Sequence, residues 1–246
     1  MAGAGDVTRE MHMFMGRLAE HAERFEDMAE HMEAIGLDAK AEELNVEERN
    51  MLSVALKSLI APKRRAVRIL SSIEQKEGRS GREVELEWCR KAKAKVIEEW
   101  SGQFERTLSL IDDHLLPSAS DVQSKVFYLK MRADYHRYDA DFQTGDERKN
   151  AADIALSAYK SAQELSVAEL PANHPGRLGV ALNFSVFYFE IVNSREEACK
   201  LAREAFDSAF DEMDTLDEDT YKDSHLIMQL LRDNLNHWSK EEKEDI

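Results

Sequence analysis

Apolar residues recur at three- and four-residue spacing along almost the whole chain of 246 residues. This spacing places them on one face of an α-helix, whereas a half-buried β-strand needs strict alternation of apolar and polar positions. No segment shows convincing alternation, so the sequence predicts an all-α protein. The expected helices span residues 8–22, 25–35, 46–75, 82–114, 122–142, 148–169, 175–192, 195–213 and 218–238.

Short polar breaks separate these helices. Gly36 is expected to end the second helix, and Asp121 and Ser194 are placed to cap the helices that follow them. No linker is long enough to divide the chain into two domains. We therefore expect a single domain of about nine antiparallel helices over residues 1–238, followed by a short acidic flexible tail over residues 239–246.

The charge and the cysteine content of the chain limit the partners and the cellular compartment that we expect. Lys and Arg number 33 and Asp and Glu number 49, which gives a formal net charge of −16. Because nucleic acids and anionic lipids bind positively charged surfaces, we expect neither a nucleic-acid partner nor a membrane partner. Two cysteines suit a reducing compartment, and residues 1–7 lack the features of a secretory signal. We expect a cytoplasmic protein, with the nucleus as a second compartment.

The sequence lacks the common motifs of catalysis. No histidine follows a glutamate at the Glu-x-x-His spacing of di-iron bundles, and neither His-Glu-x-x-His nor Cys-x-x-Cys occurs. The chain also has no phosphate-binding glycine loop and no Gly-x-Ser-x-Gly elbow. His21 and His31, each preceded by a glutamate, are expected on solvated helix faces. We expect a protein that is not an enzyme, with no catalytic residue, no cofactor and no metal site.

A basic segment interrupts the acidic chain. Five of the twelve residues from Lys57 to Arg68 are basic. On a helix, Lys57 and Arg64 lie within about 20° of each other, and such a cationic strip can attract an anionic ligand. The same strip fits a solvated charged face, a partner for the chain's own carboxylates, or a basic localisation signal. Pro62 lies inside the segment and predicts a kink, because proline removes one backbone donor.

Polar residues also interrupt apolar stripes further along the chain. Arg137 offers a planar fork of donors and Tyr138 a hydroxyl, a pair that suits phosphate but also fits an aromatic packing face. Asn183 and Asn234 each interrupt an apolar stripe at helical spacing. Because a buried amide needs partners, these stripes fit either a core or the wall of a groove that holds an extended peptide. The stripes comprise Asn183, Val186 and Glu190, and Ile227, Leu230, Asn234 and Trp238.

Several longer contiguous segments of the sequence resemble one known family. Residues 48–57 read ERNMLSVALK, residues 125–131 read KVFYLKM and residues 182–188 read LNFSVFY. Together with LIMQLLRDNL at 226–235, these segments closely resemble segments of the 14-3-3 family. The resemblance extends over about residues 18–238. The resemblance implies nine antiparallel helices, usually in a dimer, with an amphipathic groove in each protomer.

Members of that family bind phosphoserine or phosphothreonine segments of partner proteins and are not enzymes. The resemblance therefore implies an adaptor whose partners are phosphorylated proteins, present as a homodimer or as a heterodimer with a paralogue. It assigns phosphate binding to Lys57, Arg64, Arg137 and Tyr138, and binding of the ligand backbone to Asn183 and Asn234. It assigns the groove to Leu182, Val186, Glu190, Leu226, Ile227, Leu230 and Trp238. It assigns the dimer interface to Leu18, Ala22, Arg24, Asp27, Ala66 and Leu70.

The chain departs from the family pattern at several positions. His237 stands where the family has an apolar residue, Val67 replaces a tryptophan and His136 replaces a tyrosine. Residues 87–95 also differ from the family's pattern in the helix expected across the dimer interface. Pro62 and His237 leave an alternative function open, a phosphorylation-independent helical scaffold or holdase with a divergent groove.

Overall fold

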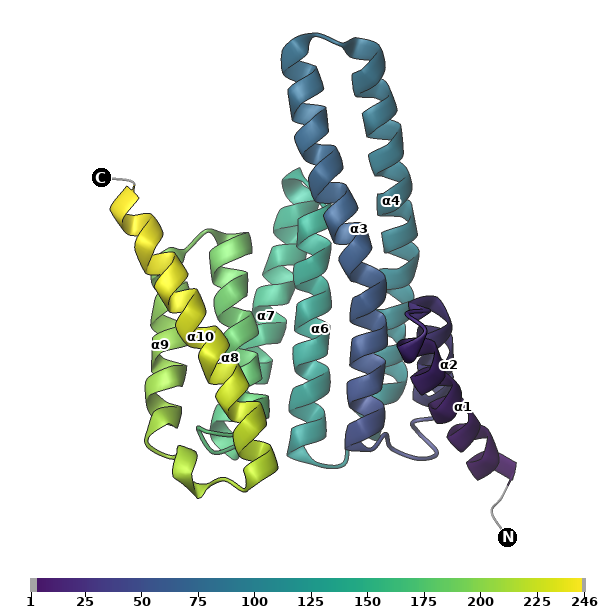
Figure 1. Cartoon of the computed structure of the whole chain (residues 1–246), viewed down its shortest axis with the longest axis vertical. Coiled ribbons are helices and arrows are strands. Elements are labelled where there is room, and N and C mark those ends of the chain that lie inside the picture. Colours follow the sequence, from purple (N-terminus) through teal and green to yellow (C-terminus); the bar gives the residue numbers. More distant parts are fainter. Residues whose placement is uncertain (1–3, 245–246) are drawn as a thin grey trace. The chain divides into compact units, whose positions relative to one another are not determined.

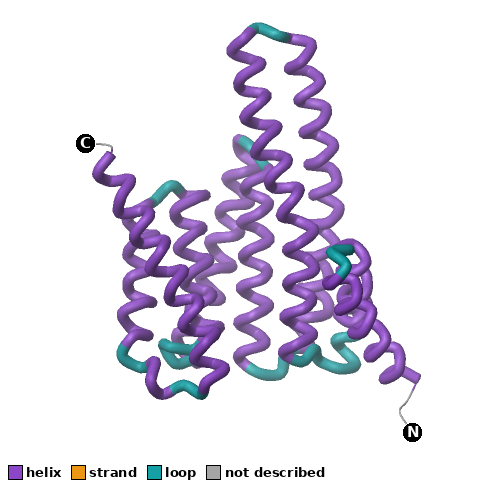
Figure 2. Tube along the Cα trace, viewed as in Figure 1, coloured by secondary structure: helices purple, strands orange, loops and turns teal. Residues whose placement is uncertain are grey.

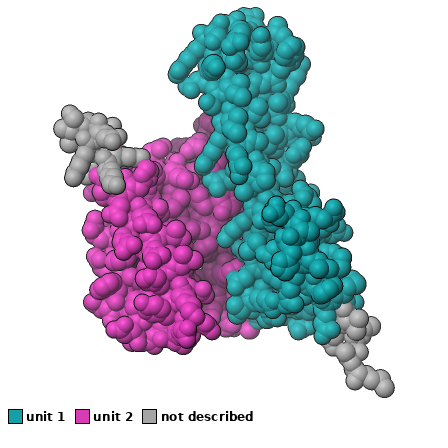
Figure 3. All heavy atoms as spheres, viewed as in Figure 1, with its two compact units in different colours: residues 1–119 teal, residues 120–246 magenta. Residues whose placement is uncertain are grey.

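The computed structural model describes residues 4–244, and the side chains of residues 8–239. Nine helices of 13 residues or more form most of this part, and no strand occurs in it (Figures 1 and 2). The predicted all-α class is confirmed. The chain divides into two compact units, residues 1–119 and residues 120–246 (Figure 3). Within the described residues, no helix is both long enough and apolar enough to cross a membrane.

The first unit contains two helical hairpins, formed by α1 (Ala4–His21), α2 (Phe25–Leu37), α3 (Val46–Ser80) and α4 (Glu83–Ser109). α1 packs on α2 and α3 packs on α4, and α2 joins the two hairpins by packing on α3 (Figure 1). Met28 and Met32 on α2, and Leu52 and Leu56 on α3, are fully buried and belong to this core. α4 continues into a π-helical stretch, η1 (Leu110–Leu115), and the short α5 (Leu116–Ser118).

Local chemistry fixes both ends of α3. At its start, the Asn45 side chain accepts a hydrogen bond from the Glu48 backbone at 3.0 Å, and the Glu48 carboxylate accepts one from the Asn45 backbone at 2.8 Å. Arg9 of α1 donates to the two carboxylate oxygens of Glu48 at 2.7 and 2.6 Å. At the other end, Gly81 adopts a left-handed φ of +69°, which glycine tolerates because it has no Cβ. These signals give the 35-residue helix a defined start and end.

The second unit contains α6 (Val122–Phe142), α7 (Gly145–Glu169), α8 (Pro175–Phe187), α9 (Arg195–Phe210) and α10 (Glu218–Glu244). A π-helical stretch, η2 (Tyr188–Val192), extends α8, and the 3-10 turn η3 (Met213–Thr215) precedes α10. α8 packs against α6, α7, α9 and α10, so it occupies the middle of this unit. Fully buried small residues such as Ala155, Ala162, Ala198 and Ala202 allow the helices to approach closely.

The predicted helix boundaries agree closely with the structure in most places. The Asp121 cap is confirmed, because its carboxylate accepts a hydrogen bond from the Ser124 backbone at 2.7 Å. Two other expectations are wrong. Gly36 lies inside α2, which ends at Leu37, and Ser194 precedes α9 without making a side-chain capping hydrogen bond.

The last helix is longer than the sequence predicts. α10 continues past Trp238 to Glu244, because the polar segment after the tryptophan contains neither glycine nor proline to end it. Residues 245–246 lie outside the described part of the chain. The flexibility of the tail over residues 239–246 stays a prediction.

Candidate functional site

The second unit buries two opposite charges on α6. Asp134 and Arg137 lie about one turn apart, and their exposed fractions are 1% and 5%. Charged side chains are seldom buried so deeply unless partners compensate for their lost hydration. Both find such partners outside α6, and the resulting cluster is the candidate site of this unit.

Asp134 accepts hydrogen bonds from three helices. Lys130 donates from one turn earlier on α6 at 2.8 Å, the Tyr159 hydroxyl donates from α7 at 2.5 Å, and the Asn183 amide donates from α8 to both carboxylate oxygens at 2.8 Å. Burial by itself would raise the pKa of Asp134. The charges of Lys130 and Arg137 and the hydrogen bonds outweigh burial and lower the pKa to about 2. Asp134 is therefore ionised at neutral pH.

Arg137 is held by the same network. Its Nε donates to the Tyr159 hydroxyl at 3.1 Å, so this hydroxyl accepts from Arg137 while it donates to Asp134. Its Nη1 lies 3.5 Å from a Glu190 oxygen, and its guanidinium stands 4.6 Å from the centre of the Tyr138 ring. Burial opposes the charge, but the oxygens of Tyr159, Tyr138 and Asp134 keep the pKa of Arg137 above its ordinary value.

This network makes Arg137 a preorganised cation. Moving its side chain would break a buried hydrogen bond to Tyr159, at a cost of about 1–3 kcal/mol. A guanidinium presents parallel donors that match the oxygens of a carboxylate or a phosphate. Its contact with Glu190 is long, at 3.5 Å, and the Glu190 side chain is 37% exposed. The contact with Glu190 is therefore weaker than the hydrogen bond from Arg137 to Tyr159.

Two predicted groove residues have internal partners. Asn183 is half-buried and both of its amide hydrogen bonds go to Asp134. Trp238 is 3% exposed and stacks on Phe189 with ring centres 4.9 Å apart. Asn234 is half-buried on α10, one turn before Trp238. Of the two interpretations of these stripes, core packing describes Trp238, while Asn183 and Asn234 keep part of their surface exposed.

The predicted apolar groove residues of α8 and α10 also differ in how deeply they are buried. Leu182, Val186 and Ile227 are half-buried and pack against the core cluster of α8, α9 and α10. Leu226 and Leu230 are exposed on α10. The second unit thus presents both polar and apolar groups at the edge of its core.

The remaining predicted phosphate ligands lie on α3 of the first unit. Lys57 is exposed and Arg64 is half-buried, and both share the helix face that their spacing predicts. Pro62 removes one backbone donor between them, but α3 continues through it to Ser80. Because Lys57 and Arg64 belong to one compact unit and Arg137 to the other, their convergence on one phosphate stays a prediction.

Comparison with known protein families matches residues 15–239 to the model of the 14-3-3 protein. The chain belongs to the 14-3-3 family. It is 54% identical over 242 residues to a 14-3-3-like protein of Pisum sativum, an alignment that covers 98% of this chain and 93% of that protein. It is 53% identical over 241 residues to 14-3-3 protein 4 of Solanum lycopersicum, with 98% and 93% covered. It is 52% identical over 245 residues to the 14-3-3-like protein GF14-E of Oryza sativa subsp. japonica, with 100% and 94% covered.

The family assignment confirms the resemblance found in the sequence segments. The match spans both compact units. 14-3-3 proteins are adaptors that bind partner proteins and are not enzymes. This chain is accordingly an adaptor, and its buried Asp134 and Tyr159 are structural groups rather than catalytic ones.

The sequence predictions do not include Lys130, Asp134 and Tyr159 among the residues of this 14-3-3 site. The four-residue spacing of Lys130 and Asp134 and the three-residue spacing of Asp134 and Arg137 do indicate ion pairs on one helix face. Tyr159 is 25 residues from Asp134 in sequence. Its position follows from the packing of α7 on α6, which no local spacing predicts.

The predicted dimer residues of this 14-3-3 chain all lie in the first unit. Leu18 is exposed on α1, and Arg24 donates to Asp27 at 2.5 Å at the start of α2. The other predicted positions are Ala22, which is exposed, and Ala66 and Leu70, which are half-buried. Their contact with a second chain stays a prediction.

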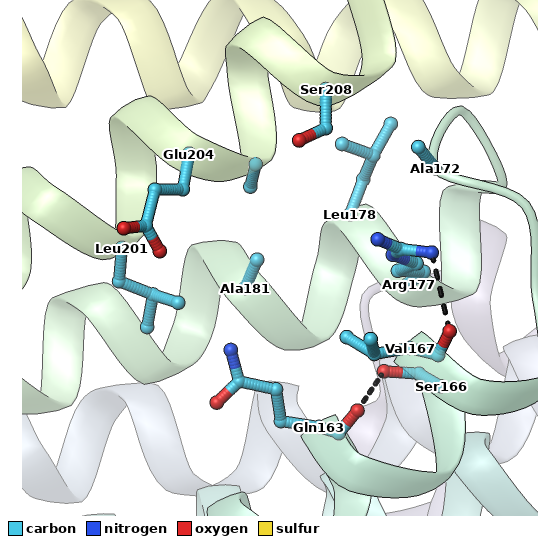
Figure 4. Close-up of a pocket in the computed structure, with 11 residues that line it drawn as sticks. Gln163, Ser166, Val167, Ala172, Arg177, Leu178, Ala181, Leu201, Glu204 and Ser208 are labelled. Carbon is cyan, nitrogen blue, oxygen red and sulfur yellow. Dashed lines mark hydrogen bonds between the residues drawn. The ribbon is translucent and has the colours of Figure 1, made fainter.

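A separate cavity of about 290 Å³ lies between α7, α8 and α9 (Figure 4). Arg177 lines it and donates to the Leu170 carbonyl at 2.9 Å, and Ser166 donates to the Gln163 carbonyl. Arg177 and Val186 are nine residues apart on α8, so they point about 180° apart. This cavity therefore opens on the face of α8 opposite the predicted groove residues of the 14-3-3 chain.

Proposed function

We propose that this 14-3-3 chain binds phosphoserine or phosphothreonine segments of partner proteins in an amphipathic groove. In this proposal Lys57, Arg64 and Arg137 bind the phosphate together with Tyr138. The main support is the fixed position of Arg137, a buried guanidinium held by Tyr159 within an otherwise acidic protein. A free hydroxyl of serine or threonine has no charge to match such a cation, whereas a phosphate has a charge near −2.

The charge balance favours a dianion bound by more than one cation. In the second unit, Lys130 and Arg137 face the single carboxylate of Asp134, which leaves one positive charge, and the exposed Glu190 partly offsets it. A phosphate of charge near −2 needs further cations to balance it. Lys57 and Arg64, which share one face of α3, are the groups that we propose for this role.

The orientation of Asn183 supports a role in holding the ligand backbone. Its Nδ2 donates to both oxygens of Asp134, which fixes the amide plane and leaves Oδ1 to accept a hydrogen bond. A backbone N–H of an extended peptide is a suitable donor for Oδ1. We propose that Asn234 holds the ligand backbone in the same way from α10. The apolar side chains Leu182, Val186, Leu226, Ile227 and Leu230 would contact the side chains of the peptide, beside Glu190 and Trp238.

The test is a titration of a fluorescently labelled phosphoserine peptide and its unphosphorylated twin into the full chain. We expect the phosphorylated peptide to bind at least tenfold more tightly, about 1.4 kcal/mol or more. Arg64→Ala should remove most of this preference, while Arg65→Ala, an exposed neighbour on α3, should keep it. Arg64 is preferred to Arg137 for this test because losing Arg137 would leave Tyr159 and Asp134 with unmet partners.

Equal affinities for the two peptides would overturn the proposal. In that case partner binding that survives phosphatase treatment would favour the phosphorylation-independent scaffold or holdase. A fluorescent fusion of the chain tests the remaining expectation, that the adaptor works in the cytoplasm and the nucleus.

We also propose that the chain forms a homodimer, or a heterodimer with a paralogue, through the first unit. This unit exposes apolar side chains on α1, including Phe14 and Leu18, and on the α3–α4 hairpin, including Ile73 and Trp88. Exposed apolar surface of this kind is costly in water and marks interaction sites on soluble proteins. The predicted interface residues lie on α1, on α2, on α3 or in the turn between α1 and α2, and they are Leu18, Ala22, Arg24, Asp27, Ala66 and Leu70.

A further inference from the structure

Two histidines of the first unit meet between α1 and α2. The Nδ1 atoms of His12 and His31 lie 3.0 Å apart, the ring centres are 5.2 Å apart, and the ring planes are tilted by 54°. Both rings are half-buried. The expectation of a solvated surface position is therefore wrong for His31, whereas His21 is exposed as predicted.

The backbone geometry around the pair is tight. Gly16 follows His12 by one turn on α1, and a Cβ at Gly16 would lie 3.2 Å from the sulfur of Met32 on α2. Met32 itself is fully buried and follows His31 directly. The two helices therefore approach closely beside the histidines.

We propose that His12 and His31 form a binding site for a divalent transition-metal cation, of which Cu²⁺ and Ni²⁺ fit best. In the metal-free protein the two Nδ1 atoms lie at hydrogen-bonding distance, which requires a proton on one of them. Both Nδ1 lone pairs become available to one cation when that proton moves, through water, to Nε2 of the same ring and the two rings turn toward the metal. Imidazole is a preferred ligand of Cu²⁺, Ni²⁺ and Zn²⁺.

The distance between the two nitrogens bears on which of these metals fits. With metal–nitrogen bonds of about 2.0–2.1 Å, two nitrogens 3.0 Å apart subtend an angle of about 91–97° at the metal. This angle matches neighbouring positions of a square-planar or octahedral cation, whereas a tetrahedral zinc site needs about 109°. The geometry therefore favours Cu²⁺ and Ni²⁺ over Zn²⁺, and Cu²⁺ also has the highest intrinsic affinity for such ligands.

The surroundings accept a cation that keeps part of its water. Among the described residues, no group of three or more His, Cys, Asp and Glu side chains could hold a metal ion, so in this proposal the protein supplies two nitrogens and water supplies the other ligands. Both rings are partly exposed, so water can reach the site.

The test is isothermal titration calorimetry of the full chain, without an affinity tag, with CuCl₂, NiCl₂ and ZnCl₂ in separate runs. We expect one site per chain, tightest for Cu²⁺. His12→Gln and His31→Gln should each weaken binding at least tenfold, and the double variant should be no worse than either, because one histidine cannot chelate. His21→Gln, which changes an exposed histidine of the same helix, should leave binding unchanged.

A second readout does not depend on variants. Cu²⁺ bound to the unaltered chain should give an electron paramagnetic resonance spectrum with coupling to two imidazole nitrogens. Ni²⁺ at about one hundred times its dissociation constant should raise the midpoint of thermal unfolding by about 5 °C. Binding of undiminished affinity in both single variants, or a spectrum with fewer than two nitrogens, would overturn the proposal. None of these residues belongs to the predicted phosphate site, so the outcome is independent of the phosphopeptide titration.

Discussion

At the scale of single residues, the hydroxyl of Tyr159 links the two buried charges of the 14-3-3 site. It accepts a hydrogen bond from Arg137 and donates one to Asp134, and its ring stacks on Phe184 with centres 5.2 Å apart. Burial and the neighbouring Asp134 raise the pKa of Tyr159, so the hydroxyl keeps its proton and can make both bonds. The position of Arg137 therefore depends on a residue that does not itself carry charge.

We expect Tyr159→Phe to lower the free energy of unfolding by about 2–3 kcal/mol, because it leaves a buried carboxylate and a buried guanidinium each one partner short. Urea denaturation followed by circular dichroism measures this loss. Tyr221→Phe, at an exposed tyrosine of α10, is the matched control and should change stability by less than about 0.5 kcal/mol. Equal effects of the two substitutions would contradict the role given to Tyr159.

The ionised state of Asp134 makes a second prediction at this scale. Because its folded pKa of about 2 lies below the ordinary 3.8, Asp134 adds stability above pH 3.8 that is lost as the pH falls through the folded pKa. The full contribution is about 2–3 kcal/mol, of which about half is lost at pH 3. The stability advantage of the unaltered chain over Asp134→Asn should shrink accordingly between pH 7 and pH 3 in urea titrations. An advantage that stays constant over this range would show that Asp134 does not titrate as proposed.

At the scale of elements, α3 illustrates how single residues set the limits of a helix. Asn45 and Glu48 cap its start, and Arg9 of α1 ties that cap to the first hairpin. At the other end Gly78 and Gly81 are only three residues apart, but Gly78 is helical and Gly81 has a left-handed φ of +69°. Neither glycine has an atom within 4 Å of an added Cβ, so the backbone alone distinguishes them.

This difference predicts opposite effects of one substitution. Gly78→Ala should stabilise the chain by about 0.5–1 kcal/mol, because alanine loses less backbone freedom in a helix. Gly81→Ala should destabilise it by about 1 kcal/mol, because a Cβ is strained at positive φ. Chemical denaturation of the two variants side by side tests the prediction, and effects of the same sign would contradict it.

At the scale of the whole molecule, the net charge of −16 keeps copies of the chain apart by repulsion, so any association must depend on local apolar contact. The first unit exposes such residues on α1 and on the α3–α4 hairpin, Leu18 among them. The second unit holds the fixed Arg137. The proposed adaptor thus combines a self-association surface in one unit with a fixed anion-binding residue in the other.

We expect Leu18→Glu to weaken self-association at least tenfold, because it places a charge in an apolar interface between two acidic chains. Sedimentation equilibrium over a range of protein concentrations measures the change in the dissociation constant. Leu37→Glu, at an exposed leucine of α2 outside the predicted interface, should leave it unaltered. A single mass equal to that of one chain before any substitution would overturn the proposed dimer.

Local patterns in the sequence were enough to predict the helices, the family and most of the residues proposed to bind a ligand. Helical periodicity depends on residues three and four apart, and the segments that resemble the family are contiguous. Both features can therefore be recognised in the sequence without a structure. The same local information identified Arg137 and Asn183 but left open whether the polar stripes line a core or a groove.

Which side chains meet, in contrast, depends on how the helices pack against one another. Asn183 binds Asp134 from 49 residues away, and His12 meets His31 from 19 residues away on another helix. Such contacts depend on how each helix is rotated and how closely it packs on its neighbour, and helix spacing does not encode either quantity. For that reason the sequence predicted a solvated His31 and overlooked Tyr159, although it placed both residues on the correct helices.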